Sequence, residues 1–446
     1  MANKLDVGTR RVGDFIDFDP DTPEVKVILE RSERGISITL PWSEPGSPYA
    51  GWFVGDGFMQ PSVLEGEKPA ERKPVPKRVL FHDSHGPVLL TDCRAKGFHA
   101  NFWGPGSGTL WSGAAILGVD HDVEYDKPHG LKTEISGLRE WLGVTSWKET
   151  YTWPDGPVVA SFTSVNADKI EIGDVDGIAL SFVPGWAVVP ESGRDARTLK
   201  DLMRCTTRST DPRPWRDHYA KHRAIRDLLV LSRWWNESCV EVLAHREDDP
   251  LTTMDSKEHG EQWRNVVVPD DTPTAPPSGY RPHIIRFADL QVTGIKAWLA
   301  LHDEFSRALD PVITCINLRE AGGHTRLAHT GPGLEALGYL LMIRDSVAEK
   351  DAARASLRAR LERILADLGD SLPFEGADWV ESFVEVYNGI KHANRAEPDM
   401  VDVLNAWQRG VLVVRAWVAA ELGVPLDELK TRLKDDAQQH GFLKVT

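Results

Sequence analysis

The hydrophobic pattern of this chain changes near Ala196, and that change limits its possible folds more than any other feature. Before it, short β-branched runs alternate with turns that contain Gly and Pro. After it, apolar residues recur every three or four positions, as in amphipathic helices. At 446 residues, the chain is also too long for one typical core. We therefore expect an α+β multidomain protein, β-rich first and helical afterwards.

Residues 1–195 are expected to form the β-rich domain. Two runs, Val25–Leu29 and Ile36–Leu40, flank Arg34-Gly35, which is typical of a β-hairpin. Further strand candidates are Arg78–Phe81 and Val88–Thr91 around His85-Gly86-Pro87, Trp111–Val119 and Gly177–Val183. Many short strands separated by Gly and Pro predict a sandwich or a barrel-like domain.

Residues 196–283 are expected to hold a helical segment and a linker. The pattern predicts helices at Thr198–Thr206 and His218–Leu243, and residues 246–282 are polar and rich in proline. Residues 284–446 are expected to form an all-α bundle. Its predicted helices are Ala288–Leu309, one that follows Gly331-Pro332-Gly333, Ala353–Leu368, Gly376–Ala393 and one that Pro398 opens.

Composition excludes several classes of protein. The formal net charge of −15 argues against a protein that coats nucleic acid, so any RNA contact must use a local basic patch. The four cysteines lie tens of residues apart, which predicts neither a disulfide framework nor a structural zinc site. We see neither an apolar leader nor a run of roughly 20 apolar residues, and we expect a cytoplasmic protein without a membrane span.

Metal and cofactor sites are not expected either. The candidate metal ligands lie around a predicted hairpin turn, where His and Asp are common because they suit the backbone of the turn. They are His82, Asp83, His85 and Asp92.

Chemistry-bearing residues gather near the end of the predicted helix Gly376–Ala393. Asn388 and His392 are four positions apart, so helical spacing would place them on one face. Lys391 lies beside them and Arg395 follows. Imidazole moves protons near neutral pH, and an amide and cations can hold a phosphate. The alternative is a surface His at a frayed helix end, with Asn and Gly as stop signals.

The C-terminal region resembles a HEPN domain, a helical bundle of many prokaryotic RNases and defence proteins, whose signature is often R-N-x-x-x-H. Tyr387-Asn388-Gly389-Ile390-Lys391-His392 matches its Asn and His in register. The N-terminal half resembles the β-rich partner domain of ApeA-type antiphage proteins, in Val25–Leu29, Gly35–Leu40 and the run Gly86–Thr91 before a Trp-rich segment.

The resemblance implies abortive-infection defence by metal-independent RNA transesterification. His392 would be the base, Asn388 the orienting amide and Lys391 or Arg395 the phosphate cation. The implied partners are an RNA substrate, with tRNA among the candidates, a phage-derived trigger sensed by the N-terminal domain, and a second copy of the chain in a homodimer.

The signature's Arg is Tyr387 in this chain. A neutral phenol makes no bidentate grip on phosphate, and losing such a contact costs about 3–4 kcal/mol in transition-state stabilisation. Either a neighbouring cation replaces it, or the site is slow or silent. The competing interpretation is a catalytically silent HEPN-like module that binds or regulates.

A second basic stretch could contact single-stranded RNA, because cations and aromatic rings are interleaved in it. Its candidate RNA-binding residues are Arg208, Arg213, Trp215, Arg216, Lys221 and Arg223. The alternative is an exposed, solvated helix start. The arginines at 354, 358, 360 and 363 are expected to make solvated pairs with Glu349 and Glu362.

Overall fold

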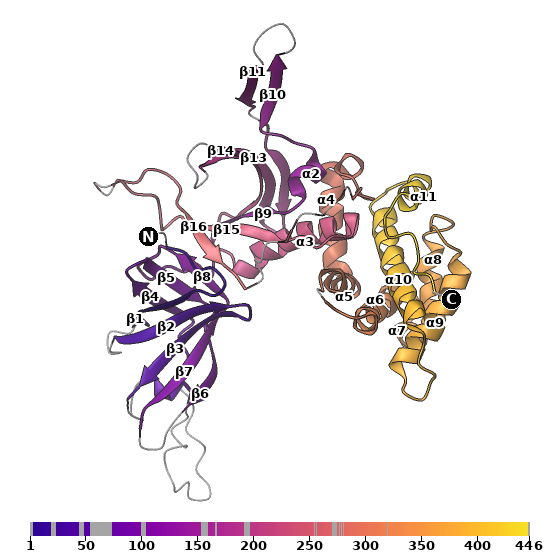
Figure 1. Ribbon diagram of the computed structural model, residues 1–446, viewed down its shortest axis with the longest axis horizontal. Coiled ribbons are helices and arrows are strands. Elements are labelled where there is room, and N and C mark those ends of the chain that lie inside the picture. The colour runs from indigo at the N-terminus through magenta and orange to yellow at the C-terminus, as the bar shows by residue number, and fades with distance from the viewer. Residues whose placement is uncertain are drawn as a thin grey trace, which may run out of the picture.

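The computed structural model of the chain describes residues 3–18, 24–43, 49–53, 74–99, 104–152, 159–165, 167–190, 197–253, 255, 257–269, 274–275, 277, 279, 281–318 and 320–444. A β-rich part comes first in the chain, and the helices that follow it lie to the other side of the molecule (Figure 1). The expected combination of an N-terminal β-rich part and a C-terminal helical bundle is confirmed.

Fourteen described strands of the β-rich part form one continuous antiparallel sheet, which has two halves. The first half contains β1 (Arg10–Ile16), β2 (Val25–Ser32), β3 (Gly35–Trp42), β4 (Arg78–Asp83), β5 (Gly86–Thr91), β6 (Arg94–His99), β7 (Gly106–Ser112) and β8 (Ala114–Leu117). The second contains β9 (Gly130–Ile135), β12 (Ile170–Val175), β13 (Ile178–Pro190), β14 (Arg197–Arg208), β15 (Cys239–His245) and β16 (Trp263–Val267). Among described residues the order is β12-β13-β14-β9-β15-β16-β8-β5-β4-β1-β2-β3-β7-β6. A separate hairpin of β10 (Trp147–Thr152) and β11 (Val159–Ser164) projects from the second half (Figure 1).

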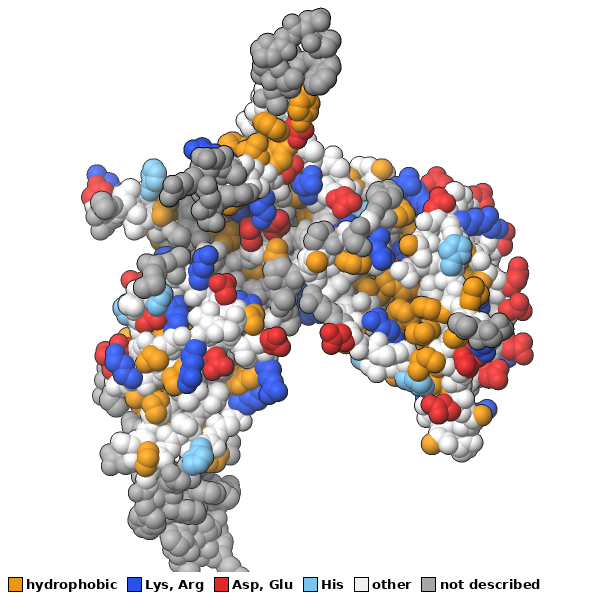
Figure 2. All heavy atoms as spheres, in the orientation of Figure 1, with side chains coloured by type: hydrophobic (Ala, Val, Ile, Leu, Met, Phe, Trp, Pro, Cys, Tyr) orange, Lys and Arg blue, Asp and Glu red, His pale blue; other side chains and the backbone are white. Residues whose placement is uncertain are grey.

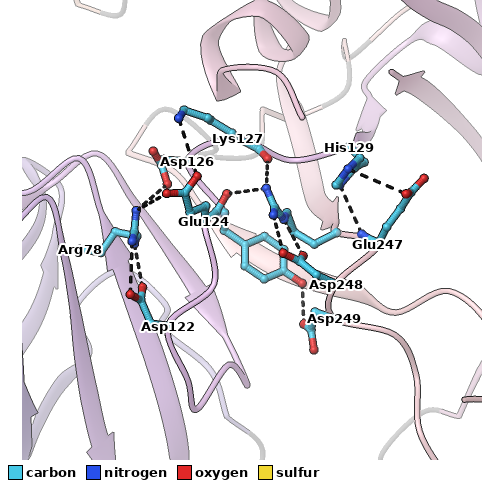
Figure 3. Close-up of polar contacts among 11 residues, drawn as sticks. Arg78, Asp122, Glu124, Asp126, Lys127, His129, Glu247, Asp248 and Asp249 are labelled. Carbon is cyan, nitrogen blue, oxygen red and sulfur yellow. Dashed lines mark hydrogen bonds and ion pairs between the residues drawn. The ribbon is translucent and has the colours of Figure 1, made fainter. Parts of the chain in front are cut away.

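β16 joins the two halves, because it pairs with β15 on one side and with β8 on the other. The segment between β8 and β9 is fixed at the same junction (Figure 3). Arg78 of β4 binds Asp122 of this segment with Nε 2.9 Å from Oδ1. Arg246 donates to the backbone carbonyls of Glu124 and Lys127 at 3.2 and 2.5 Å. The buried Tyr125 donates its hydroxyl to Asp249 at 2.6 Å. Arg78 from the first half and Arg246 from the second half therefore both bind the segment that connects β8 to β9.

The helices fall into two groups, one beside the strands and one in the bundle. Those beside the strands are α1 (Ala50–Phe53), α2 (Leu138–Leu142) and α3 (Trp215–Arg233). The later ones are α4 (Phe287–Glu304), α5 (Ser306–Asn317), α6 (Gly323–Arg344), α7 (Glu349–Arg354), α8 (Leu357–Ala366), α9 (Gly376–Lys391), α10 (Met400–Glu421) and α11 (Leu426–Lys434).

One hydrophobic core runs from the second half of the sheet through α3 into the bundle. Phe182, Leu228, Trp298, Phe383 and Trp417 belong to it and are fully buried. Burial of such side chains stabilises a fold by about 1.5–3 kcal/mol each. The bundle is thus packed onto the β-rich part through α3 and α4.

Two helix predictions between residues 196 and 245 are wrong. Thr198–Thr206 lies in β14, because β13 and β9 pair with it on both sides and that pairing overrides its local helix preference. The helix predicted at His218–Leu243 ends at Arg233, since Trp234 takes a left-handed conformation with φ of 50°. The β-branched alternation that follows forms β15. The predicted linker 246–282 also contains β16.

Other predicted boundaries in the bundle differ from the observed ones. Ala288–Leu309 is divided between α4 and α5 at Phe305. Gly331-Pro332-Gly333 lies inside α6 rather than before it, because the two glycines allow close packing, Gly331 on the Tyr387 ring and Gly333 on the backbone of Ala308. Ala353–Leu368 is interrupted at Ser356, which caps α8.

Candidate functional site

The candidate site lies at the C-terminal end of α9. The inward face of this helix carries the apolar stripe that the sequence predicts, with Trp379, Phe383 and Tyr387 buried. The helix ends at Lys391, because His392 has an extended backbone with φ −122° and ψ 108°. The His392 N–H donates to the Asn388 carbonyl at 3.1 Å, and the Arg395 N–H donates to the His392 carbonyl at 3.0 Å. His392 and Arg395 therefore lie in one tight turn after the helix.

The motif residues divide into a buried and an accessible group. Tyr387 is 5 % exposed, Asn388 is half-buried, and Lys391, His392 and Arg395 are exposed. The side chains of Asn388, His392 and Arg395 make no hydrogen bond or ion pair with any other residue that the structure describes. An amide, an imidazole and a guanidinium are thus available at one helix end. Because the His392 backbone is not helical, spacing alone does not fix the direction of its ring.

Tyr387 is part of the bundle core. Its ring lies 5.7 Å from that of Phe383, and a Cβ on Gly331 of α6 would overlap it. Burial raises the pKa of the Tyr387 phenol above its ordinary value, and so do the charge of the Glu335 carboxylate and a hydrogen bond to it. The phenol is therefore a neutral donor to Glu335, and its position leaves little room for a stacked base.

Lys391 is held on the same side of α9 as Tyr387. Its Nζ lies 2.8 Å from Glu335 Oε1 and 5.2 Å from the centre of the Tyr387 ring. Arg395, by contrast, has no ion-pair partner among the described residues. Of the two cations that the sequence offers as substitutes for the signature's Arg, Arg395 is the one whose charge is not already balanced.

A cavity of about 550 Å³ opens beside this face of α9. Its polar lining consists of Arg307, Glu335, Tyr339, Arg360, Tyr387 and Lys391. Four of these were not among the site residues predicted from sequence, because they come from three other helices. The sequence predicts that Arg360 makes solvated ion pairs, but its Nη2 donates to the carbonyls of Ala352 and Ala353 at 3.2 and 3.1 Å. The sequence signal that could have pointed to the cavity is the spacing of Glu335 and Tyr339, which are four positions apart on α6 and therefore lie on one face of that helix.

The second basic stretch lies on β14 and α3, and acidic residues hold much of its charge. Arg208 makes two hydrogen bonds of 2.6 Å to Glu261. Lys221 Nζ lies 2.5 Å from Asp176, and Arg216 lies 3.8 Å from Asp92. Trp215 stacks on Tyr219 at 5.8 Å. Arg213 and Arg223 have no ion pair with a described residue.

One group of potential metal ligands exists within the described part of the chain. Ligand atoms of Asp227 on α3, His302 on α4 and Asp310 on α5 lie within 4.8 Å of one another. No sequence motif links these three residues, which explains why sequence reasoning missed them. Asp227 already pairs with Arg226 at 2.5 Å and with His302 Nε2 at 3.1 Å, so its carboxylate has protein partners.

Two family models match the chain. The model described as ApeA N-terminal domain 1 matches residues 11–234, which is half of the chain, and the model described as Apea-like HEPN matches residues 341–428, which include α9. No curated protein and no solved structure matches. No helix in the described ranges combines the length and the apolar character that crossing a membrane requires.

Proposed function

Since this chain belongs to the ApeA family and carries its HEPN region, we propose that it is an antiphage defence protein that cleaves RNA without a metal ion. The observation that carries the proposal is the end of α9. There the side chains of the half-buried Asn388 and of the exposed His392 and Arg395 make no hydrogen bond or ion pair with a described residue. A proton carrier, an amide and a cation are the groups that metal-independent cleavage of a phosphodiester needs.

In the proposed reaction, His392 takes the proton of a ribose 2′-hydroxyl, and the freed oxygen attacks the adjacent phosphorus. The bond between phosphorus and the 5′-oxygen of the next nucleotide breaks, and that oxygen takes up a proton. The products are a 2′,3′-cyclic phosphate and a 5′-hydroxyl end. Asn388 orients the phosphate, and Arg395 balances the charge that develops on it.

The partners form part of the same proposal. RNA is the substrate, with tRNA among the candidates, and a phage-derived molecule acts as the trigger on the β-rich part. Two copies of the chain associate so that two α9 ends face one RNA. Light scattering of the purified protein tests this association, and a monomer at working concentration would contradict it.

The second candidate function is a catalytically silent binding or regulatory module. Tyr387 favours it, because the residue at the position of the signature's Arg is buried and bound to Glu335. In that case the β-rich part and the bundle would act through binding alone.

Expression during infection separates the two candidates. Wild type, His392→Ala and the matched control His440→Ala, an exposed histidine far along the chain from α9, are compared at equal protein levels. We expect wild type and the control to protect the culture and to fragment cellular RNA, and His392→Ala to do neither. Equal protection by His392→Ala with intact RNA would favour the silent module.

A further inference from the structure

Large apolar side chains are exposed where the hairpin β10–β11 meets β13, and hydrophobic side chains gather at the base of this hairpin (Figure 2). Tyr151 is 60 % exposed, Phe162 52 % and Trp186 50 %. Val188 and Val189 are exposed as well, and these five residues form the apolar patch. Exposed apolar side chains that gather in one place mark an interaction site, whereas isolated ones need no explanation.

A slot of about 250 Å³ opens within the apolar patch. One wall is a face of the hairpin, with Trp147 and Phe162, and the other is a face of β13 and β14, with Trp186 and Leu199. Leu199 is opposite Val188, which lies two positions from Trp186, so these three side chains share one face. The volume is below the roughly 300–1,000 Å³ of small-molecule sites. The slot therefore suits one anchoring side chain of a protein partner better than a whole small molecule.

The edge of β13 beside the slot is unpaired within the part of the chain that the structure describes. β14 pairs with β13 as far as Pro190, whereas β12 pairs with it only along Ile178–Phe182. The run Trp186–Val189 thus presents backbone N–H and C=O groups on an open edge. Native proteins usually protect such an edge with charged residues or proline, and this run contains neither. An open edge next to an apolar slot suits a strand added by another chain.

The charges near the apolar patch favour an acidic partner over a second copy of this chain. Lys148 on β10 and Arg197 on β14 form no ion pair or hydrogen bond with a described residue. The neighbouring carboxylate of Glu149 is engaged, because it accepts the Tyr151 hydroxyl at 2.9 Å. A second copy would bring the same two cations to the contact. A segment with carboxylates beside its apolar residues would instead be complementary to them.

We propose that the apolar patch binds an extended segment of a protein partner, which adds a strand to the open edge of β13. A large apolar side chain of the segment enters the slot between Phe162 and Trp186, and its carboxylates meet Lys148 and Arg197. This inference deepens the proposed function, on which its biological role rests, because it makes the phage-derived trigger a protein. The binding itself does not depend on RNA cleavage.

Selection of displayed peptides on the purified full-length protein tests the proposal. A library of random linear peptides is selected in parallel on wild type, on Val188→Lys and on the matched control Val12→Lys, which changes an exposed valine of β1 in the first half of the sheet. We expect wild type and the control to enrich peptides with apolar residues at alternate positions and with Asp or Glu. Circular dichroism verifies that each variant folds.

Fluorescence anisotropy then measures the binding of one synthetic peptide of the enriched sequence. We expect Val188→Lys and Trp186→Lys to weaken binding by about tenfold or more, because each places a charge in the apolar contact. Arg197→Glu should weaken it severalfold through repulsion of the peptide carboxylates, and Val12→Lys should leave it unchanged.

Two N-methylated forms of the peptide test whether it binds as a strand. Each form carries methyl groups on one alternate set of backbone nitrogens. Because only one set of N–H groups of an added strand faces β13, one form should lose binding and the other should keep it. Equal binding of both forms at the affinity of the unmodified peptide would contradict strand addition.

Three further results would overturn the proposal: no enriched peptide, a selected peptide that Val188→Lys and Trp186→Lys bind as tightly as wild type, or self-association of the protein that Trp186→Lys abolishes. A labelled single-stranded RNA is tested on the same variants, and tight binding of RNA that Trp186→Lys abolishes would assign the apolar patch to nucleic acid instead. No step involves infection or RNA cleavage, so failure of this inference and failure of the proposed reaction are distinguishable.

Discussion

Lys391 and Glu335 form an ion pair across the contact between α9 and α6, with Nζ 2.8 Å from Oε1. The same carboxylate accepts the Tyr387 hydroxyl and lies 3.6 Å from Arg360. Glu335 is therefore shared by three residues on the cavity side of α9. Lys391 is engaged there, and Arg395, in the turn after His392, is the available cation for a phosphate at the helix end.

This arrangement predicts different costs for removing the two cations. Arg395→Ala should slow RNA cleavage by about a hundredfold, because a charged transition-state contact is lost. Lys391→Ala should slow RNA cleavage only severalfold, because it breaks the partly exposed ion pair with Glu335, and such pairs contribute about 1 kcal/mol or less. Single-turnover cleavage of labelled RNA measures both rates. A hundredfold loss in Lys391→Ala with none in Arg395→Ala would reverse the assignment.

Substitutions of Tyr387 should act on stability rather than on chemistry. Tyr387→Phe should retain cleavage and lower the free energy of unfolding by about 1 kcal/mol, since one hydrogen bond to Glu335 is lost. Tyr387→Arg should destabilise the fold by several times that and restore nothing, because the guanidinium would be buried against Gly331. Urea unfolding followed beside RNA cleavage provides the comparison. A stable and faster Tyr387→Arg protein would show instead that the signature's Arg can be accommodated here.

Local patterns predicted those parts of the fold whose partners lie nearby in the chain. Arg34-Gly35 between two β-branched runs does form a hairpin, in which Ser32 pairs with Gly35. The stripe that ends at Tyr387 does face the core of the bundle. In both places, hydrophobic spacing and turn chemistry agree with the tertiary packing, so a single sequence is sufficient to predict the local structure.

Patterns failed where distant residues decide the outcome. β14 was predicted as a helix because its strand partners, β13 and β9, cannot be inferred from residues 198–206 themselves. The cavity was missed for the same reason, since Arg307, Glu335 and Arg360 come from separate helices. From the sequence alone, Lys391 and Arg395 are equal substitutes for the signature's Arg, and only the position of Glu335 on α6 distinguishes them.

Two buried histidines should make the protein sensitive to acid. His222 accepts and donates hydrogen bonds with Thr133 and Thr207 at 2.7 and 2.9 Å, and burial lowers its pKa from 6.5 to about 3. Burial likewise lowers the pKa of His218 to about 4. Because the unfolded chain binds these protons more readily, their contribution to stability is complete above pH 6.5 and is lost as the pH falls towards 4 and below.

Each neutral histidine adds a slope of about 1.4 kcal/mol per pH unit in that range. Urea midpoints at several pH values between neutrality and pH 5 measure the slope. His222→Gln should flatten the curve, and the exposed control His259→Gln should leave it unchanged. Identical slopes for wild type and His222→Gln would show that His222 does not titrate as its burial requires.

Cleavage should persist in excess EDTA. The end of α9 offers one imidazole, an amide and cations, which do not form a set of metal ligands, and the one such set among described residues lies on α3, α4 and α5. Purified protein treated with EDTA should therefore cleave RNA at its original rate. The variant Asp310→Asn, which removes the potential metal ligand on α5, should also cleave RNA at the wild-type rate. Activity that disappears on chelation, returns with a divalent ion and is absent in Asp310→Asn would move the chemistry from His392 to the Asp227 group.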